Sequence, residues 1–416
     1  MMHLAALLRK RPRGRTVRIL KVTQAYYPFT ARGGPAVKVR SIARGLVGLG
    51  NEVTVLTADL GFGPREIAAA TVFGDAEGWR TDLDGVEVIY LKTRCHYRNL
   101  TLNPGVLRFC RRRLKEFDIV HMYGLYDTLG PAVGSYCRRF GVPYFVEPLG
   151  MTRPIDRGLL LKKIWKKLAK NYLHHARKWV ATSELEREDL RAEGVPSEKV
   201  LLRFNGIDLD AFKKLPPFGA FRKRVGIPDD QRLILFLGRV IPRKGADLLI
   251  EALPQIGGDK TMLVIAGPEG ESGYMAFLRD KARTLGIDHR VLFPGPLYEE
   301  MQKEAYVDAT VFALPSRYEN FGNAAAEAIA CGTPAVVSDR CGIAPLIDQR
   351  AGLVTSYDAG AVARTLKELL NNSELYHRLK AGCSQVAEEI SWDRLMAGMQ
   401  DSYQEAMKQS FGSGST

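Results

Sequence analysis

Residues 233–245 read LILFLGRVIPRKG, and this stretch decides the fold. Five consecutive apolar residues, Leu233–Leu237, are typical of a strand that is buried on both faces of a sheet. Gly238 follows at once, as the short turn from a buried strand toward a helix requires. The stretch therefore predicts one strand–turn–helix unit of a parallel α/β sheet.

The same pattern recurs along the whole chain. In the second half, further apolar runs predict strands at Met262–Ala266, Val291–Phe293, Thr310–Leu314 and Ala335–Ser338. In the first half, strands are expected at Val17–Thr23, Glu52–Thr57, Val86–Leu91, Asp118–Met122, Tyr144–Val146, Trp179–Thr182 and Val200–Phe204, with a helix from Ala36 to Leu49. Strands alternating with helices predict two Rossmann-like, doubly wound α/β domains that bind ligands at the carboxyl ends of their strands.

The boundary between the two halves is marked by composition. Residues Asn205 to Asp230 are rich in proline, glycine and charge and are interpreted as a linker. A last helix, about Ser391 to Lys408, is expected to return to the first domain, and the tail from Gly412 is expected to be disordered. We predict a first domain of residues 1–203 plus 388–416 and a second domain of residues 204–387.

Composition excludes some classes of protein. The 416 residues are 46% hydrophobic and 25% charged, as in a globular protein. No apolar run approaches the roughly 20 residues of a membrane span. The apolar stretch Leu4–Leu8 is too brief for a secretory signal. The six cysteines show no metal-ligand spacing, which favours a cytoplasmic protein without structural zinc.

Charge is distributed unevenly. Residues 1–203 hold 36 of the 60 Lys and Arg residues and 19 of the 46 Asp and Glu residues, which makes this half +17 and the remainder −3. Such a basic half indicates an anionic partner, although solvated surface charge without a partner is the competing interpretation. The segment Leu159–Val180 is expected to form an amphipathic basic helix, and five cations stand between Arg9 and Arg15. Both could lie on anionic lipid, or the helix could be a core helix with a solvated basic face.

Two cations follow the strand Leu233–Leu237. Arg239 and Lys244 would stand just beyond its carboxyl end, where open α/β sheets bind ligands. Fixed positive charge there suits a diphosphate, whose negative charge grows as a sugar–phosphate bond breaks. The alternative is two solvated charges near a helix start, a position that the helix dipole makes unfavourable for cations.

The segment from Glu319 to Cys331 reads as a loop entering a helix at about Asn323. The free N–H groups of such a helix start bind anions, and Gly322 allows a ligand to approach closely. Along a helix, eight residues separate Glu319 from Glu327 by roughly 12 Å. Glycosidase carboxylate pairs stand about 5 to 9.5 Å apart, so these two are not expected to flank one glycosidic bond. They could hold opposite ends of a nucleotide sugar.

Gly33, Gly34 and His121 are the candidate residues of the first domain. The glycine pair follows the first strand, where its backbone amides could face a phosphate; a plain tight turn is the alternative. His121 is expected at the carboxyl end of its strand, although a lone histidine is more often structural.

In four motifs the chain resembles glycosyltransferase family 4, the retaining enzymes of the GT-B fold, in which two Rossmann-like domains face each other across a cleft. The motifs are Gly33-Gly34-Pro35, Gly238-Arg239 with Lys244-Gly245, Glu319-Asn320-Phe321-Gly322 with Glu327, and Asn205-Gly206-Ile207-Asp208. Each is weak alone, but their order and separations together are specific.

The resemblance implies roles for individual residues. Arg239 and Lys244 would hold the donor diphosphate, Glu319 the sugar hydroxyls and Glu327 the ribose hydroxyls. His121 would contact the transferred sugar, and the nucleobase would rest against the turn at Pro294. Asn205, Asn320, Phe321 and Gly322 belong to the motifs and are expected to bind substrate, together with Gly33 and Gly34.

The implied activity is retaining, metal-independent transfer of a hexose from a UDP- or GDP-linked donor to a glycan or lipid-linked acceptor, with no cofactor. Arg239 and Lys244 would do the work of a metal, so the Asp82/Asp84 and Asp208/Asp210 pairs are not needed as ligands. A place at the inner face of a membrane, in polysaccharide or glycoconjugate synthesis, fits the charge. The alternatives are a sugar-nucleotide epimerase of the same fold and a basic nucleic-acid-binding protein. The donor motifs argue against nucleic acid as a partner.

Overall fold

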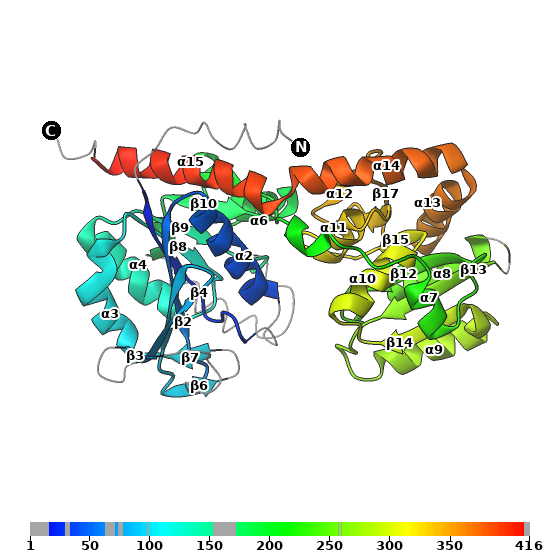
Figure 1. The fold of residues 1–416 in the computed structure, drawn as a ribbon, viewed down its shortest axis with the longest axis horizontal. Coiled ribbons are helices and arrows are strands. Elements are labelled where there is room, and N and C mark those ends of the chain that lie inside the picture. The colour runs from blue at the N-terminus through cyan, green and yellow to red at the C-terminus, as the bar shows by residue number, and fades with distance from the viewer. Residues whose placement is uncertain are drawn as a thin grey trace. The chain divides into compact units, whose positions relative to one another are not determined.

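The computed structural model describes residues 16–29, 34–62, 71–73, 78–97, 100–152, 172–256, 258 and 260–411. The chain divides into two compact units, which are Met1–Trp179 with Met396–Thr416 and Val180–Leu395 (Figure 1). We call them the first and the second unit. This division falls earlier in the chain than the domain boundary predicted at residue 204, because residues 180–203 group with the second unit. The predicted domain boundaries stay a prediction.

Within the described residues, the first sheet has nine strands in the order β11-β10-β9-β8-β1-β2-β5-β4-β3. Its strands are β1 (Arg18–Val22), β2 (Glu52–Ala58), β3 (Thr71–Phe73), β4 (Gly78–Leu83), β5 (Val86–Leu91), β8 (Ile119–Tyr123), β9 (Tyr144–Glu147), β10 (Lys178–Ala181) and β11 (Val200–Leu202). The strands β10, β9, β8, β1, β2 and β5 run parallel to one another. Beyond β5, β4 and β3 extend this edge of the sheet as antiparallel strands. A separate hairpin joins β6 (Cys95–Tyr97) to β7 (Leu100–Leu102).

The predicted parallel strands are confirmed, but the antiparallel additions were not predicted. In β4 only Gly78 and Thr81 are buried, so it carries no continuous apolar run that would identify it in the sequence. One prediction was wrong: a helix cannot continue to Val180, because residues 178–181 form strand β10, whose last three residues are buried. Most of the predicted basic helix, and the run from Arg9 to Arg15, lie outside the described residues.

Helices connect these strands: α2 (Gly34–Gly48), α3 (Gly105–Arg113), α4 (Leu129–Phe140) and α6 (Glu184–Ala192). α2 follows β1 and packs on β2 and β5, so it confirms the helix expected from Ala36 to Leu49. The last helix, α15 (Trp392–Phe411), is confirmed as well. Its Tyr403 is fully buried, with its ring 5.3 Å from that of Phe145 in β9. Burial of this kind attaches the C-terminal helix to the core of the first unit.

The second sheet has six parallel strands in the order β14-β13-β12-β15-β16-β17. They are β12 (Arg232–Leu237), β13 (Thr261–Ala266), β14 (Val291–Gly295), β15 (Val311–Leu314), β16 (Ala335–Ser338) and β17 (Gly352–Thr355). The helices are α7 (Ala220–Val225), α8 (Ala246–Ile256), α9 (Tyr274–Thr284), α10 (Glu299–Asp308), α11 (Asn323–Ala330), α12 (Ala344–Ile347), α13 (Ala359–Asn371) and α14 (Ser373–Glu389). The predicted doubly wound fold is therefore confirmed in both sheets.

The linker predicted at residues 205–230 is in part structured. α7 lies within it, Phe221 is fully buried, and the backbone N–H of Arg222 donates to Asp308 at 2.8 Å. Charged residues gave this segment the composition of a linker, but one of its charges, Arg222, is buried, and its Nη1 donates to the backbone carbonyls of Pro228 and Gln231.

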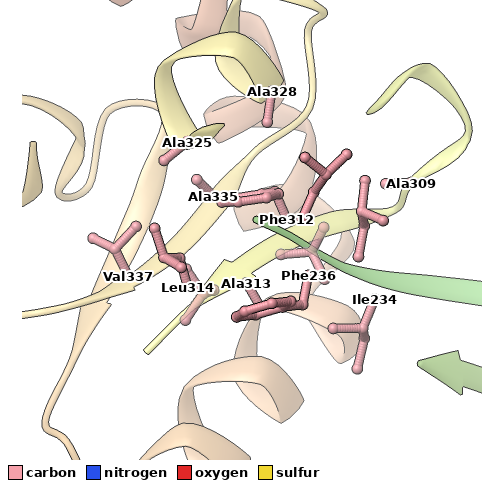
Figure 2. Packing of buried hydrophobic residues seen from close by; sticks show 14 of the residues in the cluster. Ile234, Phe236, Ala309, Phe312, Ala313, Leu314, Ala325, Ala328, Ala335 and Val337 are labelled. Carbon is pink, nitrogen blue, oxygen red and sulfur yellow. The ribbon is translucent and has the colours of Figure 1, made fainter. Parts of the chain in front are cut away.

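Small residues let α11 lie directly on the second sheet. Figure 2 shows Ala325 and Ala328 of α11 beside the strand residues Leu314 and Ala335, and all four are fully buried. An alanine surface allows close approach of helix and sheet, and dense packing of this kind resists local movement. The core therefore holds α11, and with it Glu327, in a defined place above β15 and β16.

Candidate active site

The second sheet has the strand order of a dinucleotide-binding fold. β12 pairs with β13 on one side and with β15 on the other, so the winding of the sheet reverses between β12 and β15. Open α/β sheets bind ligands at this switch point, beyond the carboxyl ends of the strands. Gly238-Arg239 leaves β12 there, and Pro315-Ser316 leaves β15, so the predicted donor motifs lie where the topology expects a ligand.

Gly245 brings the two strand ends together. Its φ is +74°, and a Cβ at this position would lie 2.1 Å from the carbonyl oxygen of Pro315. Only glycine allows this conformation together with this approach. The turn after β12 therefore packs against the backbone that follows β15, which places Lys244 beside the loop that carries Glu319.

Lys244 and Glu319 form an ion pair. Lys244 Nζ lies 2.9 Å from Glu319 Oε2, and the two side chains are 15% and 22% exposed. Arg239 is exposed and has no ion-pair or hydrogen-bond partner among the described residues. The sequence predicted both cations for the same diphosphate, but the structure distinguishes an unpaired Arg239 from a Lys244 already engaged by a carboxylate.

A strand-like backbone pairing holds the Glu319 loop. The Glu319 N–H donates to the Arg340 carbonyl at 2.9 Å, and the Gly342 N–H donates to the Glu319 carbonyl at 2.9 Å. A Cβ on Gly342 would lie 2.0 Å from the Asn320 carbonyl oxygen, so this pairing also needs a glycine. The main chain on both sides of Glu319 is thus fixed by the segment that follows β16.

Gly322 ends this loop and begins α11. Its φ is +104°, and a Cβ there would meet Cys341 Sγ at 2.7 Å. No side chain of the described residues caps the helix start. The first N–H groups of a helix carry partial positive charge and attract anions. The start of α11 thus adds to the positive field of Arg239 and Lys244 on the same unit.

Glu327 projects from α11 toward α10. Tyr306 Oη donates to Glu327 Oε2 at 2.8 Å, and Gln302 Nε2 donates to the same oxygen at 2.9 Å. Burial raises the pKa of the Glu327 carboxyl, while the Tyr306 bond and the charge of Lys244 oppose this rise. Neither Tyr306 nor Gln302 was singled out from the sequence, because only the packing of α10 on α11 brings them to the glutamate.

The side chains of three other motif residues of this unit contact other residues of the protein. Asn205 Nδ2 donates to Asn323 Oδ1 at 3.2 Å, and Asn320 Nδ2 donates to Thr182 Oγ1 at 2.8 Å. Phe321 is 2% exposed and packs in the core. These residues support the loop and the start of α11 in the structure, and their direct contact with substrate stays a prediction.

Pro294 lies at the carboxyl end of the edge strand β14 and is exposed. The next residue, Gly295, accepts a hydrogen bond from the Gly267 N–H at 2.9 Å, and a Cβ on Gly267 would lie 1.8 Å from the Gly238 carbonyl oxygen. The ends of β12, β13 and β14 therefore stand close together. The predicted contact of a nucleobase with this turn stays a prediction.

In the first unit, the structure corrects the predicted place of His121. It is the third of five residues in β8, not the strand end, and it is 1% exposed. Its Nδ1 lies 2.6 Å from Tyr403 Oη and 3.4 Å from Lys21 Nζ, and its Nε2 lies 3.5 Å from Glu147 Oε2. A buried polar network therefore surrounds this histidine.

The glycine pair is described only in part. Gly34 is the first residue of α2, beyond the carboxyl end of β1, whereas Gly33 lies outside the described residues. β1 has β2 on one side and β8 on the other, so the switch point of the first sheet is also near this turn. Contact of these glycines with a phosphate stays a prediction.

Neither Asp-x-Asp pair resembles a metal site. Asp82 Oδ1 accepts the Gly85 N–H at 3.1 Å, and Asp84 pairs with Arg40 at 2.9 Å. Asp208 accepts the Asp210 N–H at 3.2 Å. Within the described ranges, no group of three or more His, Cys, Asp or Glu side chains is placed to hold a metal ion, and no helix is long and apolar enough to cross a membrane.

Comparison with known sequences identifies two domains. The family described as "Glycosyl transferase 4-like domain" matches residues 33–206, and the family described as "Glycosyl transferases group 1" matches residues 218–384. The chain is 35% identical over 237 residues to a D-inositol 3-phosphate glycosyltransferase of Xylanimonas cellulosilytica. That match covers 55% of this chain and 57% of the relative, so the chain spans little more than half of the relative's length.

A second relative and the solved structures match over nearly the full length. An uncharacterized glycosyltransferase of Methanocaldococcus jannaschii is 28% identical over 94% of this chain and 99% of its own. Sucrose-phosphate synthase of Thermosynechococcus elongatus superposes with a TM-score of 0.71 at 20% identity, over 94% of this chain and 100% of that one. The Anabaena protein HepE, solved in complex with UDP and glucose, gives 0.72 at 17% identity, over 94% and 100%.

At these identities the structural likeness shows the fold alone, which is GT-B. The sequence matches, the two doubly wound sheets and the motifs at the switch point agree with one another. The chain belongs to the group 1 glycosyltransferases, which are enzymes of the GT4 family.

Proposed function

We propose that this glycosyltransferase moves a hexose from a UDP- or GDP-linked donor to an acceptor hydroxyl, with retention of anomeric configuration and without a metal ion. One observation carries the proposal. The unpaired Arg239 and the Lys244–Glu319 ion pair stand together at the switch point of the second sheet. A site with two cations and one carboxylate suits a ligand that is anionic at one end and rich in hydroxyls at the other.

The site has one chemical task for each residue. Arg239 and Lys244 bind the diphosphate and stabilise the charge that develops when the sugar leaves. Glu319 accepts hydrogen bonds from sugar hydroxyls, and Glu327 accepts them from the ribose. When the diphosphate binds, Lys244 either keeps its ion pair with Glu319 or exchanges it for an ion pair with the diphosphate. In both cases Lys244 is already close to the place where charge develops, so little reorganisation is needed.

Retention is what the resemblance to glycosyltransferase family 4 implies, and the carboxylates bear on the route by which it is reached. A nucleophilic carboxylate in a retaining glycosidase stands about 5 Å from its acid partner. Glu319 and Glu327 are both committed to other contacts and lie on separate parts of the loop and helix. We propose a front-face reaction in which the leaving phosphate accepts the proton of the acceptor hydroxyl. Proton NMR coupling constants of the product measure the outcome, and an inverted product contradicts the proposal.

The acceptor is proposed to be anionic or lipid-linked, at the cytoplasmic face of a membrane. The excess of positive charge in residues 1–203 supports this, as does the name of several relatives, D-inositol 3-phosphate glycosyltransferase. The described part of this half contributes a basic surface of exposed residues on the neighbouring helices α3 and α4 and just beyond α3: Arg111, Arg112, Lys115, Arg138 and Arg139.

One screen tests the donor proposal. Wild-type protein and Arg239→Ala are assayed for hydrolysis of, and binding to, a panel of UDP-, GDP- and ADP-linked hexoses, with EDTA in excess. We expect at least one UDP or GDP sugar to be bound and slowly hydrolysed, with a loss in the variant. Conversion of the sugar to its epimer without transfer would favour the epimerase alternative. Activity that EDTA abolishes and Mg²⁺ restores contradicts the metal-independent mechanism.

A further inference from the structure

Glu327 has an asymmetric environment. Both described hydrogen bonds to its carboxylate reach the same oxygen, Oε2, from Tyr306 at 2.8 Å and Gln302 at 2.9 Å. No described residue donates to Oε1. One oxygen of this carboxylate accepts two hydrogen bonds from protein donors, and the other has no partner among the described residues. Such a carboxylate is held in one orientation and can still accept a hydrogen bond.

Its two partners are built into α10. Tyr306 is 1% exposed, and its ring packs on Phe312 at 5.9 Å between centroids. Its carbonyl also accepts a 2.6 Å hydrogen bond from Thr333 Oγ1. Gln302 stands one helical turn before Tyr306, so both side chains reach the same face of α10. The rigid core thus supports two donors that meet at one oxygen.

We propose that Tyr306 and Gln302 are positioning residues that hold the Glu327 carboxylate so that its Oε1 accepts a hydrogen bond from a ribose hydroxyl of the donor nucleotide. The inference rests on the proposed function, in which Glu327 binds the ribose, and it adds the residues that orient it. Glu327 lies one turn from the end of α11 and could otherwise rotate, since among the described residues its hydrogen bonds come from α10 and none comes from α11. A fixed carboxylate binds with less loss of side-chain entropy.

Nucleotide binding with and without ribose hydroxyls tests this. Affinities of UDP and GDP, their 2′,3′-dideoxy analogues and pyrophosphate are measured by titration calorimetry on wild type, Tyr306→Phe, Gln302→Ala and Glu327→Gln. Tyr306→Phe keeps the ring and its packing and removes only the hydroxyl. We expect it to weaken binding of the preferred ribonucleotide about tenfold, as a lost hydrogen bond to a charged group does. Affinities for the dideoxy analogue and pyrophosphate stay unchanged.

Tyr274→Phe is the matched control. Its hydroxyl donates to Asp247 Oδ1 at 2.9 Å in the same unit and takes no part in the described hydrogen bonds of Glu327, so this variant should bind all ligands as wild type does. The Tyr306→Phe and Glu327→Gln losses should be less than additive, since both act through one carboxylate. A second readout is pH. Loss of the Tyr306 hydrogen bond raises the pKa of Glu327, so nucleotide affinity in the variant should decline at a higher pH than in wild type as the solution is acidified.

The outcomes separate the two claims. Failure of wild type to bind any nucleotide overturns the proposed donor and this inference with it. The other outcome is that wild type binds, but Tyr306→Phe loses affinity by the same factor for the ribonucleotide and for its dideoxy analogue. This result overturns only the positioning role, because a general structural defect does not depend on ribose hydroxyls.

Discussion

Lys244 and Glu319 show how one contact joins two motifs that are remote in sequence. Each side chain is mostly buried, and their 2.9 Å ion pair lies at the ends of neighbouring strands. Removal of either partner leaves a partly buried charge without compensation, which costs more than loss of a surface pair. The sequence predicted a role for each residue, but only their distance shows that they form one unit.

At the residue scale, Lys244→Ala should lower kcat by roughly 100-fold, because a preorganised charge at the leaving diphosphate is lost. Lys260→Ala is the control: Lys260 pairs with Asp230 at 3.2 Å, with both side chains exposed, and its loss should leave kcat unchanged. Steady-state kinetics with the preferred donor measure both variants. Unchanged turnover in Lys244→Ala would exclude it from the chemistry.

Asp127 supplies a pH-dependent contribution to stability at the start of α4. Burial raises the pKa of this carboxyl to about 6, against the backbone hydrogen bonds from Gly130 and Leu129, which lower it. A folded-state pKa above the unfolded one means that the folded protein binds the extra proton, so stability falls as pH rises through this window. From about pH 4 to pH 6, wild type should lose up to about 3 kcal/mol relative to Asp127→Asn. Urea unfolding across this pH range measures the difference, and parallel pH profiles contradict it.

Among the elements, the turn between β12 and α8 shows why a glycine is required. Gly245 and Gly226 have the same φ of +74°, but a Cβ on Gly226 meets nothing within 4 Å, whereas one on Gly245 meets the Pro315 carbonyl at 2.1 Å. A comparison of substitutions at the two positions therefore distinguishes the cost of a left-handed backbone from the cost of a steric clash.

Gly226→Ala should cost about 1 kcal/mol of stability, the strain of a left-handed alanine. Gly245→Ala should cost several times as much, or displace Lys244 and remove activity. Denaturant unfolding and donor kinetics of the two variants measure this. Equal stability and equal activity in both would mean that the approach of the two strand ends is not constrained.

At the scale of the whole molecule, charge is the feature to test. Each Lys or Arg near an anionic surface contributes about 1 kcal/mol, so five engaged residues suffice for reversible binding. We expect wild type to pellet with anionic vesicles, not with neutral ones, and to be released at 1 M salt, where the Debye length is about 3 Å.

Charge reversal locates the contact. Reversal of Arg111, Arg112, Arg138 and Arg139 to Glu should weaken sedimentation strongly, whereas reversal of Lys213 and Lys214 in the second unit should not. Retained binding after the first reversal would move the contact to other basic segments, and equal recovery of wild type in the supernatant with both kinds of vesicle would remove the membrane part of the proposal.

The amino-acid sequence alone determined the doubly wound class of both sheets and the positions of Arg239, Lys244, Glu319 and Glu327 along their elements. Buried parallel strands leave continuous apolar runs, and βα turns leave glycines, so both are readable without coordinates. Strands half exposed at an edge, such as β4, leave no such run. The charged residues of α7 led to the prediction of a linker, because an arginine that is buried and bonded to backbone carbonyls, such as Arg222, cannot be distinguished in sequence from a solvated one.

Only the tertiary structure decided which side chains meet. The pairing of Lys244 with Glu319, the two donors from α10 on one oxygen of Glu327, and the burial of His121 beside Tyr403 all join residues that are distant in the chain. Periodicity reports which face of an element is buried, because that depends on neighbours within a few residues. Contacts between elements depend on how sheets wind and helices pack, and a single sequence carries no local signal for them.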